Sequence, residues 1–300
     1  MLDAEAPLLH RLRVTRLPFF PILVLGFVLG CVHAQPPEEA MMVARLGRTT
    51  ADDILQPGDF LFRYVDPSDP LEAQITNAVI QAGQVTVASA AADISLTEQA
   101  ARDLFGADDQ RFEDALVAGD PNAVHMAIYL GDGETAEAFG TSLDDPKVGV
   151  WNLFAPYRNR TAWRVLRHRD PEVHAAIADV ARRWATGRMG YAPPFEVFVQ
   201  GASWGDHARA TALDFANAYD TPGGPPQVTS MFCSQFAVAA LQSAMARVLL
   251  PVEGALVTED LEALPVEARI DAVASPLHVY GAWSRSGAFA LVGRIVLDTE

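Results

Sequence analysis

The sequence predicts an α+β fold. Half of its 300 residues are hydrophobic, which is enough to bury the core of one large domain. Segments with the spacing of strands and of helices are mixed along the chain, without the regular alternation that is typical of a parallel βαβ sheet. No segment repeats another. These observations favour one domain in which strands and helices form separate layers.

The first 34 residues have the pattern of an export signal. Three arginines precede an almost wholly apolar run over residues 17–30, and Val32-His33-Ala34 has the small residues of a cleavage site. The run is shorter than the ~20 residues that span a bilayer. An alternative is Val28-Leu29-Gly30-Cys31, which resembles a lipoprotein box and predicts a lipid anchor at Cys31. An uncleaved anchor is the third alternative. We expect an exported protein in the periplasm or cell envelope, either free or as a membrane-attached lipoprotein.

The elements after this segment are predicted from periodicity and end signals. Residues 35–50 show no clear period and are expected to be a linker, which leaves 51–300 as a single domain. Asp170 and Pro171 mark the start of a helix that runs to about Trp184. Strands are expected over residues 60–64, from His125 to a glycine turn, around Glu137, and over residues 148–154, 162–167 and 288–297. Helices are expected over residues 71–82, within 84–120, over 205–220 and from Cys233 to Pro251, with a loop at 187–194.

Charge and histidine spacing argue against several classes of partner. The formal net charge is −16, and an acidic surface repels phosphate backbones, so we expect no nucleic acid partner. The remaining histidines, at 168, 174, 207 and 278, are scattered without the spacing of metal ligands. We therefore expect no metal and no cofactor.

Cys233 is the only cysteine that remains once the export signal is removed, so no internal disulfide is expected. Its position near a helix start, with Thr229 or Ser230 as the expected cap, favours a thiolate because unpaired amides and the helix dipole stabilise negative charge. A buried structural cysteine is the alternative. One face of this helix is wholly apolar apart from the thiol and should pack on the sheet: positions 233, 236, 237, 240, 241, 244, 245 and 248.

The segment from His125 to Glu137 predicts a hairpin whose register decides whether the two side chains meet. If only two residues form the loop, Glu137 lies opposite Ile128 and on the face away from His125. If Gly131-Asp132-Gly133 form a three-residue loop, Glu137 lies opposite Ala127 and shares a face with His125. We predict this register, through the three-residue loop or an equivalent bulge. Taken singly, His125 is also explained as a structural residue and Glu137 as a solvated carboxylate.

Several motifs follow one another in a distinctive order: Pro57-Gly58-Asp59-Phe60-Leu61-Phe62, His125 to Gly131, Ala136-Glu137-Ala138, Gly190-Tyr191 with Phe195, and Phe232-Cys233-Ser234-Gln235. The order resembles the circularly permuted branch of the NlpC-type papain-like amidases, to which lecithin:retinol acyltransferase is related. In the unpermuted family the cysteine helix precedes the histidine strand, whereas here it follows. The resemblance covers about residues 55–245 and implies a permuted papain-like fold, with an antiparallel sheet packed against the nucleophile helix.

The resemblance also implies roles for particular residues. Cys233 would be the nucleophile, His125 the base and Glu137 the third member of a triad. Tyr191 matches a family tyrosine near the active-site cleft and is expected to bind substrate, with simple packing as the alternative. The chain departs from the family at Ala127, where a glycine is usual, and at residues 84–120, which we expect to be a helical insertion and a candidate lid.

These features predict a cysteine hydrolase of the amidase or peptidase type. The resemblance implies that its substrates are small molecules or peptides with amide bonds, such as cell-wall peptides or acyl-amides. One alternative keeps the triad but acts on an acyl-lipid, as a lipid acyltransferase or thioesterase. The other alternative is a catalytically inactive binding module of the cell envelope.

Overall fold

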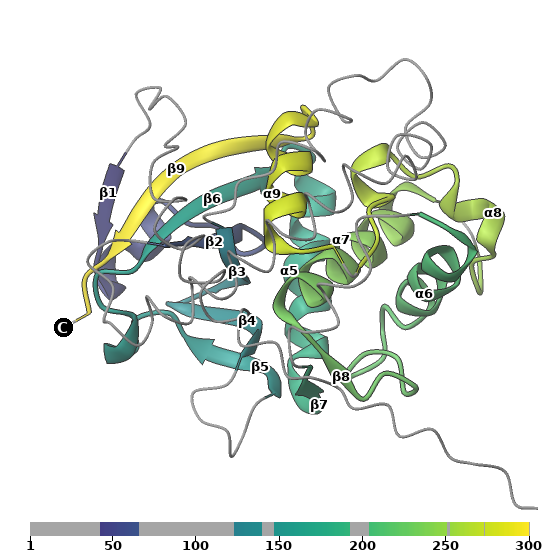
Figure 1. The fold of residues 1–300 in the computed structure, drawn as a ribbon, viewed down its shortest axis with the longest axis horizontal. Helices are drawn as coiled ribbons and strands as arrows, with labels where there is room; N and C mark the ends of the chain where they lie inside the picture. The colour runs from purple at the N-terminus through teal and green to yellow at the C-terminus, as the bar shows by residue number, and fades with distance from the viewer. Residues whose placement is uncertain are drawn as a thin grey trace, which may run out of the picture. The chain divides into compact units, whose positions relative to one another are not determined.

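The computed structural model describes residues 43–65, 123–139, 147–192, 204–250, 253–272 and 274–299, all of which belong to one compact unit, Glu38–Glu300 (Figure 1). The predicted export signal with Cys31 and the helices predicted over residues 71–82 and 84–120 lie outside the described residues. Within these ranges, none of the helices has the length and apolarity that a membrane crossing requires.

The described strands form one nine-stranded sheet, in the order β1-β9-β6-β2-β3-β4-β5-β7-β8. Neighbouring strands are antiparallel except in the outermost pairs, β1 with β9 and β7 with β8, which are parallel. This mostly antiparallel sheet with separate helices is compatible with the predicted α+β class. The strands are β1 (Val43–Leu46), β2 (Phe60–Tyr64), β3 (Ala123–Gly131), β4 (Glu134–Phe139), β5 (Lys147–Asn152), β6 (Ala162–His168), β7 (Thr186–Tyr191), β8 (Ser230–Met231) and β9 (Phe289–Leu297).

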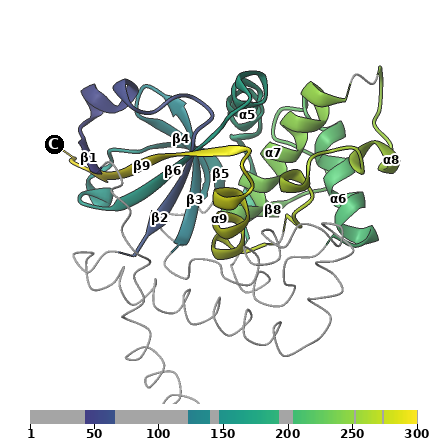
Figure 2. The same ribbon diagram turned by 90° about the horizontal axis from the view of Figure 1, so that it is seen from above.

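The helix α7 is the centre of the helical layer. It contacts β3 and β4 on one side and the helices α5, α6 and α9 on others, and Figure 2 shows α6 on the side of α7 that faces away from the strands. Two α-helices that the sequence predicts are confirmed besides α7, and α5 begins as expected because the Asp170 side chain accepts hydrogen bonds from the amides of Glu172 and Val173. The helices are α5 (Pro171–Trp184), α6 (Asp206–Asn217), α7 (Cys233–Leu249), α8 (Thr258–Leu261) and α9 (Pro276–Arg285), with 3-10 turns η1 (Arg48–Asp53), η2 (Pro156–Arg158) and η4 (Val266–Ala268).

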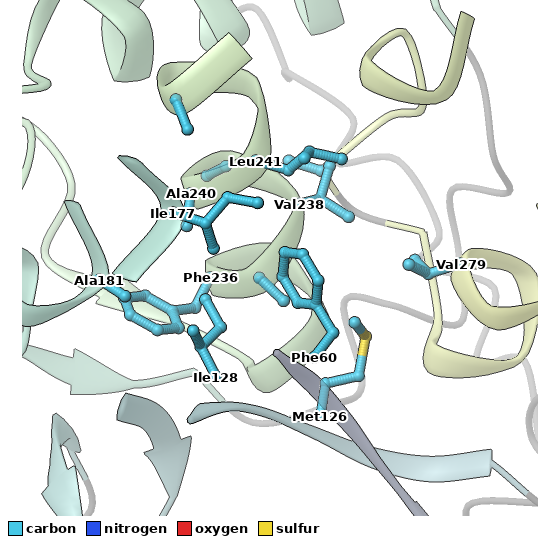
Figure 3. Packing of buried hydrophobic residues seen from close by; sticks show 14 of the residues in the cluster. Phe60, Met126, Ile128, Ile177, Ala181, Phe236, Val238, Ala240, Leu241 and Val279 are labelled. Atoms are coloured by element: carbon cyan, nitrogen blue, oxygen red, sulfur yellow. The ribbon is translucent and has the colours of Figure 1, made fainter. Parts of the chain in front are cut away.

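Each face of the sheet carries its own hydrophobic cluster. The larger cluster joins the sheet to α5, α7 and α9, and Figure 3 shows Ile128 of β3 beside Phe236 of α7. The smaller cluster lies on the opposite face and includes Ala127 and Tyr129. Because successive side chains of a strand point to opposite faces, β3 contributes to both clusters. His125 shares the face of Ala127 and therefore belongs to the side of the smaller cluster.

Three predictions about the organisation of the chain need correction. The linker predicted at 35–50 is wrong for Val43–Leu46, which pairs with β9, and for residues 48–50, which belong to η1. The loop predicted at 187–194 is wrong up to Tyr191, since β7 extends to that residue and pairs with β5 and β8. The tail beyond Leu250, which the sequence left largely unassigned, supplies α8, η4 and α9 before the predicted last strand, β9.

Candidate active site

The β3–β4 hairpin has the predicted register. Ile128 pairs with Ala136 and Tyr129 with Thr135, a register that sets Glu137 opposite Ala127. The register then shifts by one residue, so that Gly131 pairs with Glu134 around a turn of Asp132 and Gly133, which have φ of 54° and 74°. The extra residue is thus accommodated as a bulge before a two-residue turn rather than in a three-residue loop. The bulge places Glu137 on the same face as His125.

The imidazole of His125 and the carboxylate of Glu137 are directly bonded. Nε2 of His125 lies 2.5 Å from Oε2 of Glu137, and the Glu137 side chain has no exposed area. The other carboxylate oxygen, Oε1, accepts hydrogen bonds from Oγ1 of Thr135 at 2.5 Å and from Nη2 of Arg158 at 2.8 Å. Both oxygens are therefore occupied, and only one of them faces the histidine.

The surroundings of Glu137 keep it ionised. Burial alone would raise the pKa of this carboxyl group. The positive charge of Arg158, the hydrogen bond and charge of His125, and the hydrogen bond from Thr135 outweigh burial and lower the pKa to about 2. Because an ionised carboxylate only accepts hydrogen bonds, Nε2 of His125 must be the donor in the bond that joins them.

Cys233 is the first residue of α7, and its side chain is 8% exposed. Phe232 occupies the N-cap position, and its side chain makes no capping hydrogen bond. The cap predicted at Thr229 or Ser230 is wrong, because these residues come too early and Ser230 belongs to β8. The first amides of α7 therefore have no capping side chain, which leaves them available beside the thiol.

The thiol of Cys233 lies beside the imidazole of His125. Burial alone would lower the pKa of His125. The charge of Cys233 and a side-chain hydrogen bond with it, together with the bond to Glu137, raise the pKa to about 9. Since Nε2 is bound to Glu137, the other ring nitrogen, Nδ1, is left for Cys233. His125 also contacts Trp163 of the smaller cluster, with ring centroids 6.1 Å apart, whereas Cys233 belongs to the larger cluster.

Tyr191 approaches the same thiol from β7. It pairs with Met231, two residues before Cys233, and its half-buried ring packs against the larger cluster. Burial, and then the charge of Cys233, raise the pKa of its hydroxyl. Tyr191 therefore both packs in the core and lies close to the sulfur, which is the position that the sequence led us to expect for a substrate-binding residue.

Sequence reasoning missed two residues that hold Glu137. Thr135 lies two residues before Glu137 on the same strand, so strand alternation alone places it on the same face and was a usable signal. Arg158 follows Glu137 by 21 residues and belongs to the short turn η2, where no periodic pattern indicates which way a side chain points.

The other histidines take part in separate contacts. His174 is hydrogen-bonded to Asp59, with 3.1 Å between Nε2 and Oδ1, and His278 is hydrogen-bonded to the hydroxyl of Ser275. Across the described ranges, no three His, Cys, Asp or Glu side chains are grouped so that they could hold a metal ion.

The arrangement is suited to forming a thiolate–imidazolium pair. A protonated His125 stabilises a negative sulfur on one side and donates to an ionised carboxylate on the other. Comparison of the chain with models of protein families, with curated proteins and with solved structures gives no match.

Proposed function

We propose that this protein is an exported cysteine hydrolase that cleaves amide bonds, with Cys233 as nucleophile, His125 as base and Glu137 as the residue that orients the base. The observation that carries the proposal is the position of His125, whose imidazole is hydrogen-bonded to the buried, ionised carboxylate of Glu137 and interacts electrostatically with the thiol of Cys233. The raised pKa of His125 supports an imidazolium at neutral pH, which is the partner that a thiolate requires.

The reaction follows from these positions. The Cys233 sulfur attacks the carbonyl carbon, and the C–N bond breaks as the imidazolium of His125 gives its proton to the leaving amine. The product of this step is a thioester between the acyl group and Cys233. Neutral His125 then takes a proton from water, whose oxygen attacks the thioester and releases the acid, and the thiolate–imidazolium pair is restored. The uncapped amides at the start of α7 are available to stabilise the oxyanion of each tetrahedral intermediate.

The order of elements supports a circularly permuted papain-like fold of the NlpC type. The histidine strand β3 precedes the cysteine helix α7 in the chain, and α7 packs on β3 and β4 of a mostly antiparallel sheet. By the motif resemblance, the proposed substrates are cell-wall peptides or small acyl-amides. An inactive binding module is less compatible with the site, because that alternative has no use for a thiol held against an imidazole.

Substrate and mechanism are tested together by incubating the protein with muropeptides and, separately, with acyl-lipids, followed by mass spectrometry of the products. We expect amide hydrolysis of muropeptides by the wild type and none by Cys233→Ala. Ser243→Ala is the matched control, because it removes one heteroatom from another buried side chain of α7. Undiminished hydrolysis by Cys233→Ala would rule the mechanism out, and acyl transfer from the lipids alone would replace the amidase by an acyltransferase.

A further inference from the structure

We propose that Arg158 is a positioning residue of this site, which holds one oxygen of Glu137 so that the other stays aimed at the imidazole of His125. The inference rests on the proposed function, because it assigns a part in the same triad. It adds to the three residues that the motifs indicate a fourth that no motif contains.

The guanidinium of Arg158 is itself firmly held. Its side chain is 4% exposed, and Nη2 lies 2.8 Å from Oε1 of Glu137. Three aromatic rings surround it, with its central carbon 5.0 Å from the ring centroid of Phe139, 5.5 Å from that of Tyr157 and 5.7 Å from that of Trp163. Aromatic faces attract a cation, and the contacts also restrict its movement. The arginine is therefore a fixed donor rather than a mobile counter-ion.

The backbone of Arg158 is also fixed, to the residue that precedes β6. Its carbonyl oxygen accepts hydrogen bonds from the amide of Thr161 at 3.0 Å and from the Thr161 hydroxyl at 2.7 Å. The indole Nε1 of Trp163 in turn donates to the Thr161 hydroxyl at 2.9 Å. Trp163 thus supports Arg158 twice, through its ring and through Thr161, and it also contacts the ring of His125.

Because a carboxylate group is planar, holding one of its oxygens in place also fixes the direction of the other oxygen. Arg158 and Thr135 both donate to Oε1, and the position of Oε1 determines where Oε2 lies. Oε2 has His125 as its partner. Without the bond from Arg158, Thr135 alone would hold the carboxylate, and the ring of His125 would lose the fixed acceptor that sets its direction.

The charges around Glu137 also require a cation. The ionisable groups that face the carboxylate are His125 from β3 and Arg158 from η2, while Cys233 from α7 interacts with His125 and Tyr157 with Arg158. With the thiolate and imidazolium formed, Cys233 and Glu137 carry two negative charges and His125 one positive charge. The charge of Arg158 brings this buried group to neutrality, which lowers the cost of forming the thiolate.

A purely structural ion pair is the competing explanation, and the fold supplies a matched case. The buried carboxylate of Asp59 also binds an arginine and a histidine, namely Arg167, through two contacts of 2.7 Å, and His174 at 3.1 Å. Cys233 is not part of this second cluster among the contacts the structure describes. Loss of Arg167 should therefore affect folding without affecting the thiol.

The test compares Arg158→Met, Arg158→Lys and Arg167→Met with the wild type. Alkylation of Cys233 by iodoacetamide is followed from pH 4 to 10 by peptide mass spectrometry, which separates this cysteine from Cys31, and kcat/KM is measured for muropeptide hydrolysis. In Arg158→Met we expect alkylation at pH 5 to slow by about tenfold, the equivalent of one pH unit, because the buried group of Cys233, His125 and Glu137 loses the charge that makes it neutral. Arg158→Lys retains the charge and should keep the wild-type alkylation profile, while kcat/KM falls because the planar guanidinium that the three aromatic rings hold in place is gone.

The outcomes distinguish failure of the positioning role of Arg158 from failure of the proposed function. An unchanged alkylation profile in Arg158→Met, or an equal shift in Arg167→Met, would overturn the positioning role and leave the proposed function standing. A wild-type thiol that reacts only at alkaline pH would overturn both. If Arg158→Met does not fold, Arg158→Lys carries the test alone, and an unchanged kcat/KM in that variant contradicts the inference.

Discussion

Replacing Glu137 by glutamine tests the site through both stability and activity. The amide keeps the shape of the carboxylate but removes its charge. Its oxygen accepts bonds from Arg158 and Thr135, and its NH2 group then faces His125. Nε2 of His125 must become an acceptor, which moves the ring proton to Nδ1, the nitrogen left for Cys233. The imidazole is then unable to take the thiol proton, and a tautomer error of this kind costs on the order of 10³- to 10⁴-fold in activity.

The effect on stability follows from the pKa of Glu137. The folded protein lowers this pKa from 4.5 to about 2. Each pH unit between these values corresponds to ~1.4 kcal/mol, so the ionised carboxylate contributes about 3 kcal/mol to the free energy of unfolding. Because the pKa is lower in the folded state, the contribution is fully present above pH 4.5 and disappears as the pH falls towards 2. Breaking a buried ion pair typically costs ~3–5 kcal/mol, which is a similar amount. The two values describe the same interaction and are not added together.

Urea unfolding of the wild type and of Glu137→Gln, repeated between pH 7 and pH 2.5, measures this contribution. We expect the variant to be less stable by about 3 kcal/mol at pH 7, with the difference shrinking as the pH falls below 4.5. Glu134→Gln is the matched control, because Glu134 lies on the same strand, is 47% exposed and reaches Arg182 only at 3.9 Å, so its loss should change stability by less than ~0.5 kcal/mol. A difference that stays constant with pH, or one below ~1 kcal/mol at pH 7, would refute the assignment of Glu137 as a buried, ionised partner.

Two further substitutions, one of them with a matched control, test features outside the triad. Tyr191→Phe removes a hydroxyl close to the thiol and should lower kcat/KM about tenfold without changing the melting temperature, whereas a residue that only packs would leave kcat/KM unchanged. Gly58→Ala should destabilise the protein by more than ~2 kcal/mol, since φ is +104° and the added Cβ would lie 2.2 Å from the backbone oxygen of His174. Gly187→Ala, at φ +76° with no atom within 4 Å, should cost only ~1 kcal/mol, and thermal melting of both variants checks the difference.

The pairing of His125 with Glu137 was predictable because both residues lie in the same short segment of the chain. His125 and Glu137 belong to one hairpin, where strand alternation and two glycines leave few registers, and only one of these lets the side chains meet. The form of the extra residue, a bulge before the turn, was not determined by the sequence. Arg158 was not predictable, because the path of the turn η2 and the ring of aromatic side chains around it depend on strands that meet only in the folded sheet.

The same distinction explains which parts of the fold were predicted. The helix α5 has a local start signal in Asp170 and Pro171, and its prediction is confirmed. The strand β1 has four residues, too few to show alternation, and it exists because it pairs with β9 near the other end of the chain. The strand β7 contains Gly187 and Gly190, which indicate a loop until the partners β5 and β8 are known. Pairing between distant segments thus created the elements that local patterns missed.

Asp59 and Glu137 are two fully buried carboxylates, and they show how the same kind of ion pair can serve either the fold or the candidate site. Asp59 receives donors from the turn that follows η1, from β6 and from α5. Arg167 donates to both of its oxygens, His174 is hydrogen-bonded to Oδ1, and the amide of Gln56 donates to Oδ2. Its charge is therefore used to join segments of the chain. Glu137 has the same classes of partner, but one oxygen is reserved for His125, whose second nitrogen is left for the thiol of Cys233. The contacts of this buried charge lead on to a thiol, and this difference between two otherwise similar clusters is the strongest physical reason to look for chemistry at Cys233.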